Sequence, residues 1–501
     1  MLLPRTLSSI FLVVSVSFAI DVSVKKSRVW GPGLNADFLL PVRYFYVQLI
    51  NKDGSNLTES VGEKAITVNI VPGSDRARIW TQVLDRHDGS YIVRYRPFST
   101  SSDLSIHVLY NGRHIADSPY ILKGDIYHET CNCPHQTAEQ WAAAVGCTAT
   151  YAQIENDLEP FKSVDMTKVA KEAVERFNQA GQHSICHYKI ISNKVYRKCY
   201  GEHVGFKMFG DAILLSLSRK MFLPDIEFFL NLGDWPLETK RLDESPLPIF
   251  SWCGSKSSRD IVMPTYDLTE ATLEMMGRVS LDMFSTQANT GPKWANKTAV
   301  AFWRGRDSRR ERLDLVETAL KHPDLVDARL THMFFFPKDP AKYGELVPHI
   351  SFFDFFKYKY QLNIDGTVAA YRFPYLLAGD AAIFKQDSEY YEHFYNDLIP
   401  NVHYIPLKHD LSDVLEKVKW AREHDDLVQK IAQNGQQYAR EHLNPADVLC
   451  YHVRLFQKYA TLLKRKPQIV KGFELVEQPT EGAACSCSKS KDSVKIPEKE
   501  L

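Results

Sequence analysis

The chain has 501 residues, of which 44% are hydrophobic and 24% are charged, and its formal net charge is zero. This length exceeds one ordinary hydrophobic core, so two or three globular domains are expected. The absence of a basic excess argues against general nucleic-acid binding.

The two ends of the sequence predict a compartment. Residues 1–19 combine Arg5, an apolar stretch from Ile10 to Phe18 and small residues at the end, which is typical of a secretory signal peptide. No later apolar run reaches the length of a membrane span. The chain ends in Glu498, Lys499, Glu500 and Leu501, which resembles the Lys-Asp-Glu-Leu retention signal. We therefore expect a soluble protein of the endoplasmic reticulum (ER) lumen that binds the ER retrieval receptor.

Residues 24–124 predict a β-sandwich. Short alternating runs at 68–71, 91–95 and 106–110 are separated by turn signals such as Asp88-Gly89 and Asn111-Gly112. Evenly spaced short strands over this length are typical of such a fold. Titratable residues do not cluster here, so we assign this segment a binding or spacing role.

Nine cysteines are spread along the chain. They are too sparse for a disulfide scaffold and are not spaced as a zinc site, so structural bridges with one thiol left over are expected. Residues 125–154 hold three of these cysteines and predict a linker joined to another part of the chain. Asn56 and Asn296 begin N-glycosylation sequons, and the second is less certain because it lies close in sequence to the anion site described below.

Residues 155–470 predict two α/β domains that face a cleft. Expected strands at 225–232, 361–364 and 404–407 alternate with helical segments, which implies open, mostly parallel sheets covered by helices. Apolar residues from Leu411 to Ala421 recur at helical spacing, with Asp410 placed to cap the helix. Residues 471–501 are polar and charged and predict a mobile tail.

Asp234 is a candidate general base. It follows the strand expected at 225–232, and ligands of open α/β sheets lie beyond the carboxyl ends of strands. Partial desolvation beside Trp235 would raise the pKa of Asp234 and help it accept a proton. A turn aspartate that binds local backbone amides is the alternative.

Two arginine-rich segments are candidate anion sites. Five arginines occur in residues 302–312, directly after the apolar run 298–302. A strand, a glycine and the start of a helix form a typical anion site, and arginine binds phosphate through two parallel hydrogen bonds. A solvated basic surface is the alternative, to which we assign Arg309 and Arg310. The second segment, 365–372, combines Gly366 and small residues with an arginine.

Two such segments in one domain suit a diphosphate, whose charge must be stabilised as it leaves. No Asp-x-Asp pair occurs in the sequence, so arginines and helix N-termini would neutralise a nucleotide diphosphate without a metal held by such a pair. Glu392 could bind a ribose hydroxyl, although a solvated helix carboxylate is the favoured interpretation.

Several motifs together resemble known families. The segments Trp30–Leu34, Asp88–Tyr95 and His114–Tyr120 look like a filamin-type immunoglobulin repeat. Together with that repeat, the whole chain resembles the KDEL motif-containing protein O-glucosyltransferases. The motifs that carry this second resemblance are Asn231–Pro236, Trp303–Ser308, Asp365–Arg372, Tyr390–Phe394 and His403–Pro406.

This resemblance implies a multidomain fold with a GT-B-like catalytic region of two Rossmann-like domains after the sandwich. It implies inverting, metal-independent transfer of glucose from UDP-glucose, and in some relatives xylose from UDP-xylose, to a serine of EGF-like repeats of the Notch or fibrillin type. A non-catalytic ER lectin or chaperone, with the filamin-type module as client-binding surface, is the competing hypothesis. A glycosidase would need paired carboxylates.

The resemblance also assigns residues. Asp234 takes the role of catalytic base, and the implied acceptor stretch lies within 265–290. The implied donor-binding residues are Gly305, Arg306, Arg312, Thr367, Val368, Ala369, Ala370, Tyr371 and Arg372. Arg306 departs from a relative that has serine there. A bridge from Cys131 or Cys133 to Cys450 is implied as well.

Overall fold

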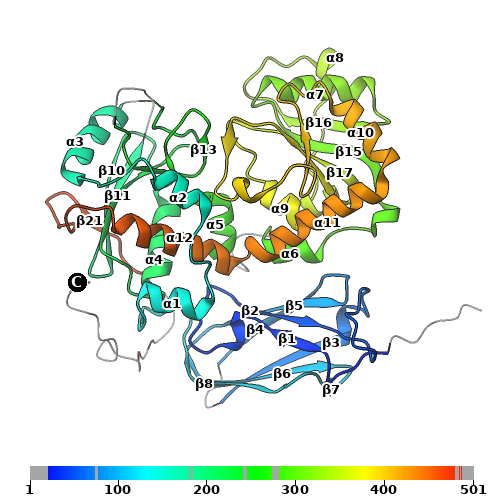
Figure 1. The fold of residues 1–501 in the computed structure, drawn as a ribbon, viewed down its shortest axis with the longest axis horizontal. Helices are drawn as coiled ribbons and strands as arrows, with labels where there is room; N and C mark the ends of the chain where they lie inside the picture. Colours follow the sequence, from blue (N-terminus) through cyan, green and yellow to red (C-terminus); the bar gives the residue numbers. More distant parts are fainter. Residues whose placement is uncertain are drawn as a thin grey trace, which may run out of the picture.

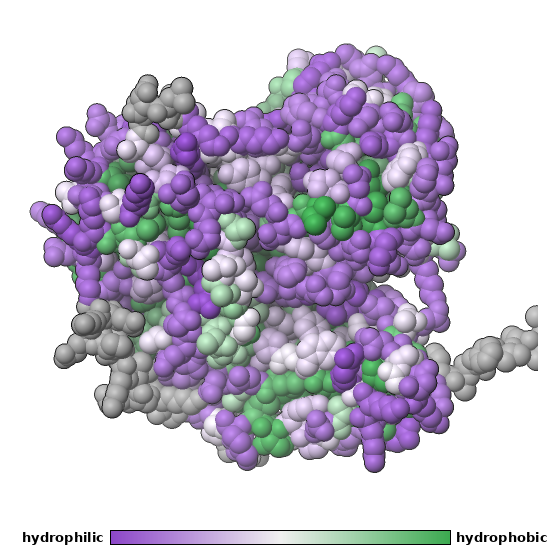
Figure 2. Space-filling model, viewed as in Figure 1, coloured by the Kyte–Doolittle hydropathy of each residue, from purple (hydrophilic) through white to green (hydrophobic). Residues whose placement is uncertain are grey.

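The computed structural model describes residues 21–73, 77–179, 181, 184–240, 245–273, 281–479, 485 and 487. The expected signal peptide and the expected retention sequence, Glu498 to Leu501, lie outside these residues. The described chain forms a β-sandwich and two α/β units, which lie side by side above the sandwich in the view of Figure 1. Figure 2 shows that this face is mainly hydrophilic, with hydrophobic residues in separate patches.

The N-terminal unit is a sandwich of two antiparallel sheets. One sheet has the order β1-β2-β5-β4, and in the other β3, β7 and β8 all pair with β6. The strands are β1 (Arg28–Trp30), β2 (Arg43–Gln48), β3 (Ile66–Pro72), β4 (Ile79–Asp85), β5 (Ser90–Pro97), β6 (Ser101–Tyr110), β7 (Arg113–His114) and β8 (Tyr120–Ile126). The strands expected at 68–71, 91–95 and 106–110 are confirmed as β3, β5 and β6.

The first α/β unit has a mixed sheet of order β14-β12-β11-β9-β10-β21. Only the pairs β11–β12 and β12–β14 are parallel, and the other three pairs are antiparallel, so the expectation of a mostly parallel sheet is wrong here. The cause is a tight turn at Ser192 and Asn193, both with positive φ, which joins β9 to β10 as a hairpin. The strands are β9 (Ile185–Ile191), β10 (Lys194–Tyr200), β11 (Ile226–Asn231), β12 (Ile249–Ser251), β14 (Ile261–Val262) and β21 (Glu474–Leu475).

Helices cover this first sheet and continue its core. They are α1 (Ala138–Val145), α2 (Ala152–Leu158), α3 (Met166–Phe177), α4 (Lys207–Lys220), α5 (Tyr266–Leu273) and α12 (Pro445–Ala460). Helix α1 and the start of α2 fall within the expected linker 125–154, and Trp141 of α1 is only 1% exposed. Helix α1 is therefore packed on the folded core through its buried residues Ala138, Trp141 and Ala142.

The second α/β unit has the expected parallel sheet, of order β16-β15-β17-β18-β20. Its strands are β15 (Thr298–Arg306), β16 (Val326–His332), β17 (Tyr358–Asn363), β18 (Ala382–Gln386) and β20 (Ile405–Leu407). Its helices are α6 (Met283–Ala288), α7 (Arg310–Lys321), α8 (Pro340–Tyr343), α9 (Phe373–Ala378), α10 (Val414–Glu423) and α11 (Asp425–His442). Across the described ranges, no helix is long and apolar enough to cross a membrane.

Helix α10 begins three residues later than its pattern suggests. Leu411 has a φ of 60°, which a right-handed helix does not contain, so the helix starts after it. Asp413 is the N-cap residue. Asp410 instead accepts hydrogen bonds from the amide and hydroxyl of Ser412. The predicted cap at Asp410 is therefore wrong, because this aspartate stabilises the turn before the helix.

A two-stranded ladder joins the α/β units. Strand β13 (Gly254–Ser255) belongs to the first unit and pairs with β19 (Tyr390–Tyr391) of the second. A Cβ atom on Gly254 would lie 2.4 Å from the ring of Tyr391, so only glycine allows this approach. The ladder fixes the two units around the cavity described below.

Three of the four disulfides connect distant parts of the chain, and the fourth joins the neighbouring strands β9 and β10. The pairs are Cys131–Cys485, Cys133–Cys487, Cys147–Cys450 and Cys186–Cys199, and Cys253 is free and buried. The implied bridge from Cys131 or Cys133 to Cys450 is wrong, because Cys147 of the α1 segment lies against α12. The expected mobile tail is also wrong for residues 474–475, 485 and 487, which are held by β10 and by two of the bridges.

Peptide mapping without reduction is expected to recover these four pairs, and alkylation of the unfolded, unreduced protein is expected to label Cys253 alone. The paired substitution Cys147→Ala and Cys450→Ala should lower the free energy of unfolding by about 2–5 kcal/mol, measured by chemical denaturation. A peptide that links Cys131 or Cys133 to Cys450 would contradict the observed connectivity.

Candidate active site

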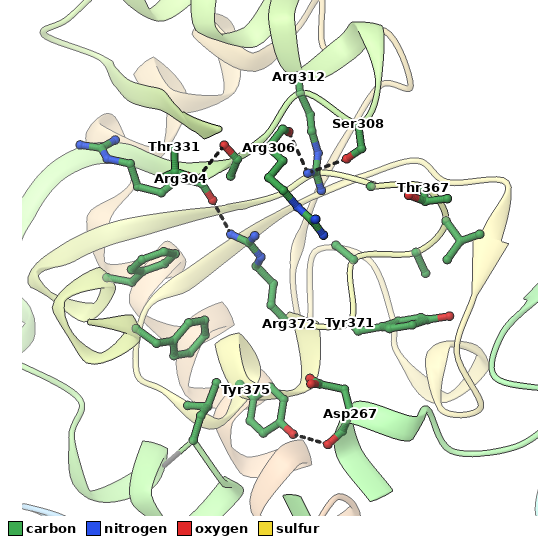
Figure 3. A pocket seen from close by; sticks show the side chains of 18 of the residues that line it. Asp267, Arg304, Arg306, Ser308, Arg312, Thr331, Thr367, Tyr371, Arg372 and Tyr375 are labelled. Atoms are coloured by element: carbon green, nitrogen blue, oxygen red, sulfur yellow. Dashed lines mark hydrogen bonds between the residues drawn. The ribbon is translucent and has the colours of Figure 1, made fainter. Parts of the chain in front are cut away.

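A cavity of about 490 Å³ lies between the two α/β units. Asp234, Tyr266 and Asp267 of the first unit form one wall, and the carboxyl end of β15 and the 366–372 loop form the other. All sequence-predicted catalytic and donor-binding residues line this cavity: Asp234, Gly305, Arg306, Arg312, Thr367, Val368, Ala369, Ala370, Tyr371 and Arg372. Figure 3 shows the arginine side of the cavity.

Asp234 lies directly beyond β11, on the wall opposite the arginines. Its Oδ1 accepts a hydrogen bond of 3.1 Å from the hydroxyl of Tyr266. Desolvation raises the pKa of Asp234, while the Tyr266 hydrogen bond and the charge of Arg306 act in the opposite direction. The direction agrees with the sequence prediction, but the aromatic residue that binds the carboxylate is Tyr266. Trp235 is 57% exposed.

Buried polar groups hold the turn that carries Asp234. Asn231 donates to the carbonyl of Trp235 at 2.7 Å and to Ser251 Oγ at 3.1 Å, and it accepts from the amide of Gly233 at 2.8 Å. Ser251 in turn donates to the buried carboxylate of Asp260 at 2.6 Å. These buried polar groups form hydrogen bonds with one another, and together they fix the backbone on both sides of Asp234.

Arg312 is buried in the opposite wall. Its Nε donates to the carbonyl of Asp365 at 2.7 Å, and Nη2 donates to the carbonyl of Ile364 at 2.9 Å. Nη1 donates to the carbonyl of Arg306 and to Ser308 Oγ, both at 3.0 Å. Burial, followed by repulsion from Arg372, lowers its pKa to about 9, so it remains charged at neutral pH. Arg312 thus joins the ends of β15 and β17 and has few donors left for a ligand.

Arg306 and Arg372 present their guanidinium groups to the cavity. Arg372 donates one hydrogen bond, from Nη1 to the carbonyl of Arg304 at 2.7 Å. Burial lowers its pKa to about 10, and Asp267 acts in the opposite direction. The Arg306 side chain is exposed and points into the space between Arg312 and Arg372 in Figure 3. Three cations therefore converge on one space, and an anion bound there would relieve their mutual repulsion.

Other predicted residues have different surroundings from those expected. Arg309 is not in a solvated face: its Nε donates to the carbonyl of Gly366 at 2.7 Å, and its guanidinium lies 5.2 Å from the Tyr390 ring centre. Arg310 is exposed and pairs with Asp314, as expected. Glu392 is not a solvated helix carboxylate, because it is 0% exposed and burial raises its pKa to about 8.

The two predicted glycosylation acceptors, Asn56 and Asn296, are both exposed. Asn296 lies two residues before β15, whereas the arginines lie at and beyond the other end of that strand. The concern that it adjoins the anion site is therefore wrong, since a nine-residue strand separates them.

Sequence reasoning did not single out the lining residues Tyr266 and Asp267, although both fall within the implied acceptor stretch 265–290. Desolvation by the cavity walls raises the pKa of Asp267 to about 6, while Arg372 acts in the opposite direction. Both residues follow β14, and the strand-end rule applies to them as it does to Asp234. The signal is weak because β14 has only two residues, too few to form a recognisable pattern.

Comparison with known proteins identifies the class of this fold and site. Residues 142–499 match the model of glycosyl transferase family 90, and residues 21–121 match the filamin/ABP280 repeat. The chain therefore belongs to glycosyl transferase family 90 and is a transferase that also carries a filamin-type repeat.

Its relatives are protein O-glucosyltransferases. The chain is 55% identical to protein O-glucosyltransferase 2 of Danio rerio, and the 471 aligned residues cover 94% of each chain. It is 50% identical to human protein O-glucosyltransferase 3, again over 94% of each chain. Human protein O-glucosyltransferase 1 is 31% identical over 66% of this chain and 84% of its own length.

Arg312→Lys is expected to lower the free energy of unfolding by about 2–3 kcal/mol, because a lysine cannot satisfy the four oxygens that Arg312 binds. Chemical denaturation measures this change. Arg310→Lys, in the first turn of the same helix, is the matched control and should change stability by less than about 0.5 kcal/mol. Equal effects of the two substitutions would contradict a special structural role for Arg312.

Proposed function

We propose that this protein is an inverting O-glucosyltransferase that transfers glucose from UDP-glucose to a serine of EGF-like repeats. The observation that carries the proposal is the position of the Asp234 carboxylate, at the end of β11 and bound by Tyr266, opposite three converging arginines across one cavity. A GT-B-like arrangement is part of the proposal, and the position of the cavity between two α/β units supports it. The names of the relatives support the transfer of glucose to protein.

The arginine wall suits the diphosphate of the donor. Arg306 and Arg372 would bind its oxygens directly, and Arg312 would add its charge and hold Gly366 and the following loop close to the ligand. Arginine neutralises phosphate through planar, paired hydrogen bonds, so this wall can stabilise a leaving UDP without a metal ion. Metal independence is part of the proposal.

Asp234 acts on the acceptor. The serine hydroxyl gives its proton to the carboxylate of Asp234 as its oxygen attacks the anomeric carbon of α-linked glucose. The bond from that carbon to the UDP oxygen breaks on the opposite face, and its electron pair leaves with UDP. A single displacement yields a β-linked glucose and a protonated Asp234. The hydrogen bond from Tyr266 orients the carboxylate before transfer.

The cellular setting follows from the same proposal. An enzyme of the ER lumen would meet EGF-like repeats of secreted and cell-surface proteins, and the C-terminal sequence would bind the retrieval receptor. UDP-xylose is a second candidate donor. It lacks one hydroxymethyl group, and a pocket can discriminate such a difference by about 1–3 kcal/mol.

The direct test incubates the protein with a folded EGF-like repeat, UDP-glucose or UDP-xylose, and EDTA, with the product measured by mass spectrometry. We expect a hexose on serine with EDTA present. Asp234→Asn should reduce turnover by about 10²–10⁴-fold, because it removes the base. Calorimetry with UDP is the control and should give nearly unchanged affinity. Full activity of Asp234→Asn would exclude this residue as the base.

The rate should also depend on pH. Asp234 must be deprotonated to accept the serine proton, so kcat/KM should fall as the pH decreases through its raised pKa, above the ordinary value of about 4. Tyr266→Phe removes a hydrogen bond that lowers this pKa, so the acid limb should move to higher pH. Rates measured after return to neutral pH control for unfolding. An acid limb that does not move would contradict the pairing of Tyr266 with the base.

A further inference from the structure

The filamin-type module meets the catalytic region through a buried ion pair. We propose that Arg94 of β5 is a positioning residue for the transferase. It holds helix α6, and through α6 it holds helix α9 and Arg372, the cavity-lining residue directly before α9. This inference rests on the proposed donor site.

Arg94 uses all three guanidinium nitrogens at the interface. Nη1 contacts Asp282 Oδ2 at 3.0 Å, and Nη2 donates to Ser285 Oγ at 3.1 Å. Nε donates to Gln82 of the neighbouring strand β4 at 2.8 Å, which fixes the guanidinium to the sandwich. The side chains of Arg94 and Asp282 are only 6% and 2% exposed. A buried ion pair tolerates little displacement, because each charge depends on the other for compensation.

Asp282 transmits this contact to the backbone of α6. Its Oδ1 accepts hydrogen bonds from the amides of Phe284 and Ser285, both at 2.9 Å, so Asp282 is the N-cap of the helix. Its Oδ2 accepts from Ser285 Oγ at 2.8 Å and pairs with Arg94. The charge of Arg94 therefore helps to orient Asp282, the residue that caps the start of α6.

Apolar and polar contacts hold the rest of α6 on the sandwich. Phe284 is 0% exposed and lies edge-on to Tyr44, with ring centres 4.6 Å apart. Near the other end of the helix, Arg86 Nη2 donates to Gln287 Oε1 at 2.6 Å. Contacts along the whole length of α6 show that the module does more than separate domains, since a flexible spacer needs no such buried interface.

The opposite side of α6 reaches the cavity. Met283 belongs to the same buried cluster as Phe373, Leu376 and Leu377 of α9, and Figure 1 shows α6 between α9 and the sandwich. Helix α9 begins immediately after Arg372, and Leu281, next to Asp282, lines the cavity. A shift of α6 would thus be transmitted by close packing to the arginine wall.

Arg94→Met tests the proposal. It leaves Asp282 without its partner, and displacement of Arg372 should raise both the KM for UDP-glucose and the Kd for UDP by about 2- to 30-fold. Arg94→Lys keeps a cation opposite Asp282 and should give a smaller increase. Lys293→Met is the matched control: Lys293 pairs with Glu59 across the same interface, but both side chains are exposed. Its KM and Kd should equal those of the wild type.

Thermal melting establishes that each variant is folded at the assay temperature. Unchanged KM and Kd in folded Arg94→Met would overturn the proposal. If Arg94→Met does not fold, Arg94→Lys decides: a raised KM supports the proposal, and wild-type values overturn it. Failure of wild-type protein to bind UDP or to transfer glucose would instead refute the proposed function, so the two failures are distinguishable.

Discussion

The buried guanidinium of Arg312 is the contact on which the arrangement of the site depends. It binds backbone oxygens at the ends of two neighbouring parallel strands, β15 and β17, and so determines where both loops leave the sheet. Burying a cation is unfavourable unless its donors find partners, and here the chain itself accepts four hydrogen bonds from the guanidinium. Because Arg312 is satisfied in this way, Arg306 and Arg372 are left to face the cavity.

The cavity combines two walls with different electrostatic character. Desolvation on the side of the first unit raises the pKa of Asp234, which favours proton uptake. Converging cations on the other side favour a bound anion. Each unit supplies one half of this arrangement, and the β13–β19 ladder and the Tyr266–Tyr371 ring contact hold the halves together. The proposed active site therefore belongs to the interface between the units.

The sandwich is part of this assembly. Its sheet β1-β2-β5-β4 contributes Tyr44 and Ile92, and the loop before β2 contributes Phe38, to the same apolar core as the first α/β unit. The packing of Phe284 and the Arg94–Asp282 pair extend the contact to the second unit. A binding or spacing role, first assigned to the module, does not explain why it buries surface against both α/β units. Client docking on this sheet would compete with contacts that the chain already makes.

The sequence alone determined the local features that depend on neighbouring residues. Alternating runs and turn signals predicted β3, β5 and β6, and strand ends followed by Asp234 or by arginines predicted the lining of the cavity. Tertiary structure decided what depends on residues far apart in the chain. In the folded chain Cys147 pairs with Cys450, and Glu392 is buried. Arg312 donates its hydrogen bonds to the protein itself, whereas Arg306 faces the cavity. Composition and spacing cannot show these outcomes, because burial and hydrogen-bond partners are set by segments that only folding brings together.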